Sequence, residues 1–320
     1  MKVALTLFGA LFISVSAMAQ QPSQYSLYML NKVQQNPAYA GLDNSLVATG
    51  VFRRQWTGLE GSPTTQALNV HLPIYYLNSG FGLKFENDVL GASQQLSITG
   101  VYSYQVLMDN GVLSFGVEGG IVQRSLDGEL LRTPEGVYQD DAFDHNDQIL
   151  PFGLETAVAT TFGAGIYYQT EQFEIGVAAQ NITEAEAAFS TLNLQLVRYY
   201  TLMASYSFDI SRSFSLQPSV LVRSDINQTQ VEASVLTTYN ENIFGGVGFR
   251  GYNSETIDAV SFIAGFKLSE NLSLGYAYDY TLSDLNVVST GSHEIVVSYN
   301  LNRIFGKGQP PRIIYNPRSL

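Results

Sequence analysis

Apolar and polar residues alternate with a period of two along most of this chain. In residues 272–280, leucines and tyrosines alternate with serine, glycine, alanine and aspartate, and residues 96–106 repeat the pattern. Successive side chains of a β-strand point to opposite faces of a sheet, so this alternation predicts strands. The same period recurs in residues 158–168, 173–180, 200–210, 214–223, 231–239 and 295–301.

The number and length of these runs favour a membrane barrel over a soluble sandwich or propeller, which also alternate. The runs predict an all-β chain of about 14 strands. A strand of about 10 residues, tilted near 40°, rises roughly 25 Å, which is the height of the apolar band of an outer-membrane barrel. Aromatic residues near strand ends, such as Tyr168, Tyr239 and Tyr280, are typical of interfacial girdles. We therefore predict a transmembrane antiparallel β-barrel.

The connections between the predicted strands alternate in length. Tight turns are expected at 109–111, 169–172, 209–213, 240–242 and 269–271, and longer loops at 124–155, 181–196, 251–256 and 282–292. Outer-membrane barrels have short periplasmic turns and long external loops. We therefore expect an outer-membrane protein of a Gram-negative bacterium, with an even strand number and with both termini periplasmic.

Four regions follow from this reading of the chain. Residues 1–19 resemble a signal peptide, with Lys2, an apolar core and an Ala-Met-Ala cleavage box. Residues 20–45 have no clear period and are predicted as a periplasmic or plug segment that folds into or across the lumen. Residues 46–301 form the barrel. Residues 302–320 form a basic, proline-containing periplasmic tail, in which Arg312 and Arg318 are candidates for binding a partner.

Composition narrows the function classes. The chain has no cysteine, so no disulfide framework holds it, and only 14% of its residues are charged. Its formal net charge of −12 argues against nucleic acid as a partner, because phosphates require clustered Lys and Arg. No stretch outside the N-terminus reaches the 18 or so consecutive apolar residues of a membrane helix.

No enzymatic constellation is evident, and no cofactor is expected. Residues 246–251 match a G-x-G-x-x-G pattern, but they lie in a predicted strand and lack the following helix that a dinucleotide site needs. The chain has only three histidines, His71, His145 and His293. An embedded lipase stays open as an alternative, because the members of a catalytic triad can lie far apart in sequence.

The long loops contain two candidate features. Asp140, Asp141, Asp144 and Asp147 could supply carboxylate oxygens to Ca²⁺, although the spacing and the glycine of an EF-hand are missing and a solvated external loop is the simpler interpretation. Residues 183–186 form a capping-box pattern, which predicts a short external helix with Phe189 available to a partner.

The first predicted strand is atypical. Arg53 and Arg54 are adjacent, so one of them should face lipid unless the strand is bulged or the pair lies near the interface. Trp56, the only tryptophan, is most simply a girdle residue at the end of this strand.

Several segments resemble a known family. They are Gln24-Tyr25, Asn31, the N-P-A-Y-A-G block at 36–41, R-R-Q-W-T-G at 53–58, S-P-T-T at 62–65 and G-V-A-A-Q-N at 176–181. Together they resemble the PorP/SprF family of type IX secretion system outer-membrane proteins. The resemblance makes Asn36, Pro37, Tyr39, Gly41, Arg53, Arg54 and Trp56 candidate partner-binding residues.

The resemblance implies a non-enzymatic barrel that helps to export or anchor a large cell-surface protein, including gliding adhesins, by receiving its C-terminal sorting domain. It also implies contacts with periplasmic components of the secretion machinery, in addition to outer-membrane lipid. The alternative is a passive porin-like channel for small or lipidic solutes.

Overall fold

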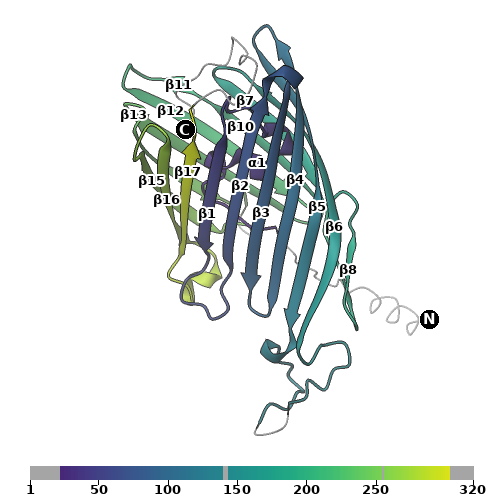
Figure 1. Ribbon diagram of the computed structural model, residues 1–320. Helices are drawn as coiled ribbons and strands as arrows, with labels where there is room; N and C mark the ends of the chain where they lie inside the picture. Colours follow the sequence, from purple (N-terminus) through teal and green to yellow (C-terminus); the bar gives the residue numbers. More distant parts are fainter. Residues whose placement is uncertain (1–21, 140–142, 254–255, 303–320) are drawn as a thin grey trace, which may run out of the picture.

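The computed structural model describes residues 22–139, 143–253 and 256–302. Fourteen strands form a closed antiparallel β-barrel (Figure 1), which confirms the predicted fold class. Each strand pairs with the next along the chain, β10 pairs with β12, and β17 pairs with β1 to close the ring. The barrel strands are β1 (Val47–Arg54), β2 (Thr64–Ile74), β3 (Ser79–Leu90), β4 (Ser93–Met108), β5 (Gly111–Asp127), β6 (Leu154–Gln169), β7 (Phe173–Gln180), β10 (Tyr199–Tyr206), β12 (Phe214–Ser224), β13 (Thr229–Tyr239), β14 (Ile243–Arg250), β15 (Ala259–Lys267), β16 (Leu272–Thr281) and β17 (Ser292–Asn300).

The two faces of the wall have opposite polarity. On β3, Leu83 and Phe85 point outward and are 55% and 37% exposed, whereas Lys84 and Glu86 point inward and are buried. Apolar side chains outside and polar side chains inside are the pattern of a barrel whose outer solvent is lipid. The apolar residues of the alternation therefore mark lipid-facing positions, while a separate hydrophobic cluster inside the barrel joins inward side chains such as Leu221 and Leu236 to residues of the N-terminal segment.

The connections separate the barrel into two ends. One end, called here the short-turn end, carries connections of two to seven residues at 75–78, 109–110, 170–172, 207–213, 240–242 and 268–271. The other, called the long-loop end, carries the connections at 55–63, 91–92, 128–153, 181–198, 225–228, 251–258 and 282–291. In Figure 1 the long-loop end is at the bottom, where the 128–153 connection hangs below β5 and β6.

The 181–198 connection differs from its prediction. Residues 183–186 start no helix; instead β8 (Glu186–Ala188) and β9 (Asn193–Gln195) pair as a hairpin. Phe189, expected to be exposed, is 9% exposed and packs with Val122, Ala157 and Ala187. The predicted helix and the exposed Phe189 are therefore wrong, because burying this apolar face against β5 and β6 outweighs the local capping preference.

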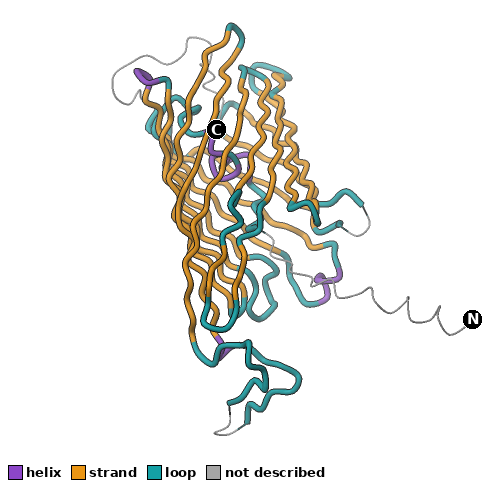
Figure 2. Tube along the Cα trace, turned by 90° about the vertical axis from the view of Figure 1, so that its right-hand side faces the viewer, coloured by secondary structure: helices purple, strands orange, loops and turns teal. Residues whose placement is uncertain are grey.

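Short helical turns account for the remaining elements. They are η1 (Tyr28–Leu30), α1 (Lys32–Gln35), η2 (Pro37–Tyr39), η3 (Tyr75–Leu77), η4 (Gly128–Leu130) and η5 (Asp284–Val287), and a two-residue strand, β11 (Phe208–Asp209), extends β10. None of the helices in the described ranges has the length and apolar character to span a bilayer. Figure 2 shows the short helices of the N-terminal segment enclosed by the strands. The predicted signal peptide, residues 1–19, lies outside the described residues.

Candidate functional site: the filled lumen

Residues 22–46, called here the plug, run through the lumen from the long-loop end to the short-turn end. At the long-loop end, Ser23 accepts a hydrogen bond at its carbonyl oxygen from Arg223 Nη1 at 2.6 Å. At the short-turn end, the Tyr75 hydroxyl donates to the carbonyl oxygen of Asn44 at 2.6 Å, just before β1 begins at Val47. Burial raises the pKa of Tyr75 to about 12, so this hydroxyl stays a donor near neutral pH. The plug therefore begins at the long-loop end and continues into β1 at the short-turn end.

The N-P-A-Y-A-G block is the most tightly seated part of the plug. Asn36 Nδ2 donates to the carbonyl oxygens of Ile166 at 3.1 Å and Val177 at 3.0 Å. Its Oδ1 accepts from the backbone N–H of Ala38 at 2.9 Å and caps η2. One buried amide therefore joins the plug to β6 and β7 and also orders its own turn.

Glycines of the wall make room for this block. A Cβ at Gly116 on β5 would lie 2.2 Å from the backbone nitrogen of Ala38, and one at Gly80 on β3 would lie 2.0 Å from the carbonyl oxygen of Ala40. In the plug, Gly41 has a φ of +77°, which other residues adopt only with strain. The close approach of two backbones therefore requires glycine on both sides.

A hydrogen-bonded chain fixes the end of the block. The Gly41 N–H donates to His71 Nδ1 at 3.1 Å, so Nδ1 carries no proton and the neutral ring carries it on Nε2. His71 Nε2 lies 3.3 Å from Asp43 Oδ2, and the Tyr39 hydroxyl donates to Asp43 Oδ1 at 2.7 Å. The histidine of β2 therefore positions the plug.

A buried ion network fixes the other end of the plug. Arg53 Nη1 lies 3.0 Å from Glu294 Oε2, and Arg53 Nη2 lies 2.8 Å from Asp279 Oδ2. Glu294 also accepts from the backbone N–H groups of Ser26 at 2.8 Å and Leu27 at 3.0 Å. Strands β1, β16 and β17 are thus tied to the plug through one carboxylate pair and one guanidinium.

Arg250 of β14 enlarges this network. Its Nη1 lies 3.0 Å from Asp258 Oδ2 and its Nη2 lies 3.3 Å from Glu232 Oε2. The Ser26 hydroxyl oxygen accepts from Arg250 at 2.9 Å and from Arg53 at 3.0 Å, while the hydroxyl donates to Asp279 at 2.7 Å. Two arginines therefore meet at one serine of the plug. Because an unpaired buried charge is costly, loss of any single charged member should destabilise the protein.

Further ion pairs line the opposite wall. Lys32 of the plug lies 2.6 Å from Glu174 Oε2, which also accepts from the Tyr167 hydroxyl at 2.8 Å. Lys84 lies 2.6 Å from Glu118 Oε2 on the neighbouring wall. The lumen thus holds charged groups that are paired with one another.

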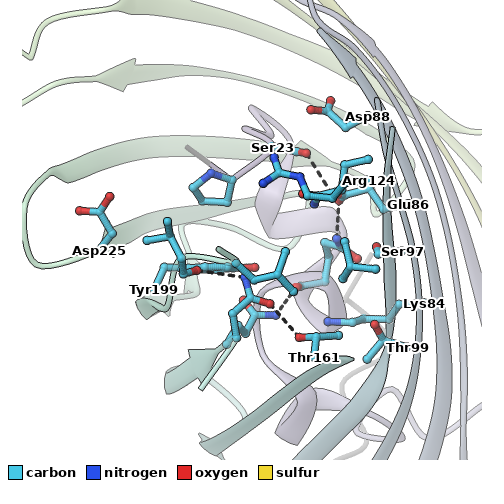
Figure 3. A pocket seen from close by; sticks show the side chains of 18 of the residues that line it. Ser23, Lys84, Glu86, Asp88, Ser97, Thr99, Arg124, Thr161, Tyr199 and Asp225 are labelled. Carbon is cyan, nitrogen blue, oxygen red and sulfur yellow. Dashed lines mark hydrogen bonds between the residues drawn. The ribbon is translucent and has the colours of Figure 1, made fainter. Parts of the chain in front are cut away.

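A cavity of about 410 Å³ remains at the long-loop end, between the plug, β3 to β6 and the β8–β9 hairpin (Figure 3). Charged side chains from several elements border it, together with Leu192, Leu194 and Leu196 of the hairpin. The charged residues are Lys84, Glu86, Asp88, Glu118, Arg124, Arg223 and Asp225. The plug contributes Gln34, which donates to Glu86 Oε2 at 2.6 Å, so the wall and plug are joined here as well.

The structure gives most of the candidate residues a role inside the barrel. Asn36, Pro37, Tyr39 and Gly41 are buried in the plug, where they contact the wall, and their binding to a partner stays a prediction. Arg53 is 1% exposed and faces the lumen. Only Arg54, the last residue of β1, points outward, which explains the adjacent pair without a bulge.

The other candidates are placed less centrally. Trp56 follows β1 and its backbone N–H donates to Ser292 Oγ at 3.0 Å. Arg312 and Arg318 lie outside the described residues, as do Asp140 and Asp141. Asp144 and Asp147 each accept a backbone N–H within the loop, from Asn146 and Ile149 at 2.8 Å. Across the described part of the chain no three His, Cys, Asp or Glu residues are grouped to hold a metal, and the Ca²⁺ site stays a prediction.

Neither of the other histidines contacts a nucleophile of the kind that a hydrolase needs. His145 bonds to the Tyr138 hydroxyl and to the carbonyl oxygen of Pro151 inside its loop, and His293 Nδ1 bonds to the Tyr276 hydroxyl. These contacts stabilise loop and wall. The expectation that the chain is not an enzyme stays a prediction.

The residues that sequence reasoning missed are the inward charges of the network: Ser26, Glu232, Arg250, Asp279 and Glu294. A signal for them was present. Asp279 interrupts the alternation of small residues in 272–280, and a lone carboxylate at an inward strand position requires a partner across the lumen.

Comparison with solved structures shows the same fold. Matching structures include the CymD monoaromatic hydrocarbon channel, with a TM-score of 0.50, 15% identity and coverage of 89% of this chain and 94% of that chain. The TodX deltaS2S3 mutant monoaromatic hydrocarbon channel has a TM-score of 0.50, 13% identity and coverage of 88% and 95%. No curated protein matches the chain. The family model "Type IX secretion system membrane protein PorP/SprF" matches residues 17–299.

Proposed function

The chain belongs to the PorP/SprF family of type IX secretion system membrane proteins, and on that premise we propose that it is a non-catalytic outer-membrane adaptor. In this role it receives the C-terminal sorting domain of a large secreted surface protein and helps to export or anchor that protein. Gliding adhesins are one class of such partners.

The filled lumen is the observation that carries this proposal over a passive channel. The plug is joined to the wall by Arg53, Arg250, Glu294 and Asn36, all of which are buried. Removing one partner of a buried ion pair costs about 3–5 kcal/mol, so thermal opening of the whole plug is rare. A barrel whose interior is occupied in this way offers its rims and outer surface to other proteins.

The orientation of the barrel follows from the same proposal. The short-turn end faces the periplasm and the long-loop end faces outward, as in other outer-membrane barrels. The 128–153 connection presents exposed apolar side chains, among them Phe143, Ile149 and Phe152. These side chains can contact a secreted partner, while Arg312 and Arg318 of the tail are available to an acidic periplasmic component.

The test is a tagged version of the full chain, purified from its native outer membrane in mild detergent. We expect a secreted surface protein to co-purify, and its C-terminal sorting domain, fused to a fluorescent protein, to bind the purified barrel. Deleting the chain should release that surface protein into the medium. Replacing Arg312 and Arg318 with Ser should weaken the periplasmic contacts and leave sorting-domain binding intact.

A conductance measurement separates the adaptor from the passive channel. The purified barrel in a planar bilayer should show no steady conductance. Steady conductance or rapid solute uptake by the intact protein, without capture of a sorting domain, would establish the channel and overturn the adaptor.

A further inference from the structure

The strand β6 has a free edge at the long-loop end. Strand β7 pairs with β6 only from Ala164 to Gln169, and the last backbone–backbone hydrogen bond beyond this ladder is the Ile182 N–H donating to the Phe162 carbonyl oxygen at 2.9 Å. On its other side, β6 is paired with β5 along its whole length. In the described part of the chain, no strand pairs with residues 154–161 on the side away from β5.

The direction of the free backbone groups follows from this last contact. In an antiparallel strand, the N–H and C=O of every second residue point to the same side. The Phe162 carbonyl points away from β5, and the register with β5 is continuous, so Leu154, Thr156, Val158 and Thr160 point the same way. Within the described ranges, these four residues have no backbone hydrogen-bond partner at this edge.

The β8–β9 hairpin lies beside this edge but, in the described ranges, does not pair with it as a strand. Its buried residues Ala187 and Phe189 pack with Val122, Ala157 and Ala159, whose side chains point into the lumen. At the tip of the hairpin, the Ser190 N–H donates to the Glu155 carboxylate at 3.1 Å. The hairpin therefore covers the inner face of β5 and β6 and forms no backbone hydrogen bond with the edge of β6 in the described ranges. Figure 1 shows β8 beside the lower part of β6, where β5 and β6 extend beyond β7.

The edge has one charged residue, the inward Glu155, and no Lys, Pro or bulge between residues 154 and 162. Natural edge strands are protected by Lys, Pro or a bulge. Residues 154–162 read L-E-T-A-V-A-T-T-F, and the pairing with β5 continues through them without an extra residue. The outward side chains of Leu154 and Val158 are 69% and 55% exposed, so the free edge is also apolar.

The free edge lies at the border of the lipid-facing band. On β5, the outward partners of Val158, Thr156 and Leu154 are Gln123, Ser125 and Asp127, all polar. Unpaired backbone groups cost several kcal/mol in hydrocarbon, so a free edge is placed where water or another chain can reach it. An apolar, unpaired edge at this height is suited to receive a strand.

Charge favours a partner with basic residues beside its strand. The residues around this edge, in 127–155 and 181–198, are mostly acidic: Asp127, Glu129, Glu135, Asp144, Asp147, Glu155, Glu184 and Glu186, against Arg132 and Arg198. A second copy of this chain would bring the same acidic residues to the edge. Like charges across an interface are unfavourable, so an unlike partner is preferred.

We propose that the edge of β6 from Leu154 to Thr160 is a strand-addition site, which pairs with an extended segment of the secreted protein's sorting domain. The segment alternates apolar residues, which continue the row of Leu154 and Val158, with small or polar ones, and it is flanked by Lys or Arg. Backbone hydrogen bonds give affinity in this mode of recognition, and the side chains give selectivity. The identity of the partner rests on the proposed function.

Proline substitution tests the backbone contact. Val158→Pro removes an N–H that points to the free edge and keeps the β5 ladder, because that N–H does not face β5. The probe is the sorting domain fused to a fluorescent protein. We expect its affinity for the barrel to fall about tenfold or more, because the substitution removes backbone hydrogen bonds between the edge and the added strand. Val158→Thr is the matched control and should bind as the unaltered protein does. Heat-dependent gel migration confirms that both barrels are folded.

Disulfide cross-linking tests the geometry, since the chain has no cysteine of its own. Thr156→Cys and Val158→Cys should cross-link to every second residue of one strand in the sorting domain. Ile166→Cys, on the same face of β6 where β7 pairs, should not cross-link.

The outcomes separate this inference from the proposed function. If the unaltered barrel binds the sorting domain and Val158→Pro binds it equally without cross-links, strand addition is wrong and the adaptor stands. If Val158→Cys cross-links to a second barrel, the edge joins copies of this chain and the inference is overturned. If the unaltered barrel captures no sorting domain, the proposed function fails and the strand-addition site fails with it.

Discussion

Arg53 and Glu294 are direct register partners across β1 and β17, the two strands whose pairing closes the barrel, and their side chains meet at 3.0 Å inside the lumen. Glu294 also holds the backbone of Ser26 and Leu27. One carboxylate therefore joins the closing seam of the wall to the plug. The stability of the barrel and the position of the plug depend on the same few charges.

The first prediction concerns this seam. Arg53→Met leaves Glu294 and Asp279 buried with fewer counter-charges, so the free energy of unfolding should fall by about 3–5 kcal/mol. Urea unfolding in detergent or lipid, followed by tryptophan fluorescence of Trp56, measures the change. Arg54→Met, at the outward-facing neighbour, should shift the free energy of unfolding by no more than about 0.5 kcal/mol. Equal effects of the two substitutions would refute the buried network.

The second prediction concerns the seat of the plug. Gly116→Val places side-chain atoms where the backbone of Ala38 lies, so the plug must leave its seat and the barrel should conduct ions in a planar bilayer. Gly100→Val on β4 is the control, because a Cβ there meets nothing closer than 3.8 Å. Deleting residues 22–44 should give the same conductance as Gly116→Val. An insulating deletion variant would show that the plug does not close the lumen.

The third prediction concerns His71. His71→Phe removes the acceptor of the Gly41 N–H and the donor to Asp43, and the buried groups left unpaired should cost about 1–3 kcal/mol each. We expect faster backbone amide exchange at Gly41. His293→Phe, whose ring nitrogen bonds only to Tyr276 in the described ranges, should leave exchange at Gly41 unchanged. Unaltered exchange in His71→Phe would contradict the assigned contact.

The fourth prediction concerns the β8–β9 hairpin. Phe189→Ala removes the largest side chain that holds the hairpin against β5 and β6, and truncating a buried Phe costs about 3–5 kcal/mol. We expect protease cleavage within 181–198 while the barrel stays folded. Phe152→Ala, at a side chain that is 57% exposed, should leave the 181–198 connection resistant. Cleavage in neither variant would mean that other contacts hold the hairpin.

Sequence reasoning reached the barrel because lipid imposes a strict rule on every strand. Outward positions such as Leu83 and Phe85 must be apolar because they face lipid. Since every second residue of a strand faces outward, the sequence shows apolar residues with a period of two. The alternation of short and long connections was also predictable, because the length of each connection is given by the residues between two predicted strands. Both the alternation and the connection lengths are local patterns, which can be recognised in the sequence without knowing which residues are in contact.

The lumen was less predictable because its contacts join residues far apart in the chain. Ser26 meets Asp279, and Asn36 meets Val177, and no local pattern encodes such pairs. The N-P-A-Y-A-G block stood out as a motif, but its role could be read two ways, as a surface for a partner or as a seat in the wall. The wall glycines at 80 and 116 show that the block is seated in the wall, because they leave the space that its backbone occupies.

The seam also has a consequence for biogenesis. Ser26 lies near the start of the described chain and Glu294 near its end, yet the Ser26 N–H donates to the Glu294 carboxylate. A nascent polypeptide interrupted before Ser292 would lack both the ring-closing hydrogen bonds and the anchor for its own beginning. The N-terminal segment therefore reaches its final contacts only after β17, the last strand of the barrel, has been synthesised.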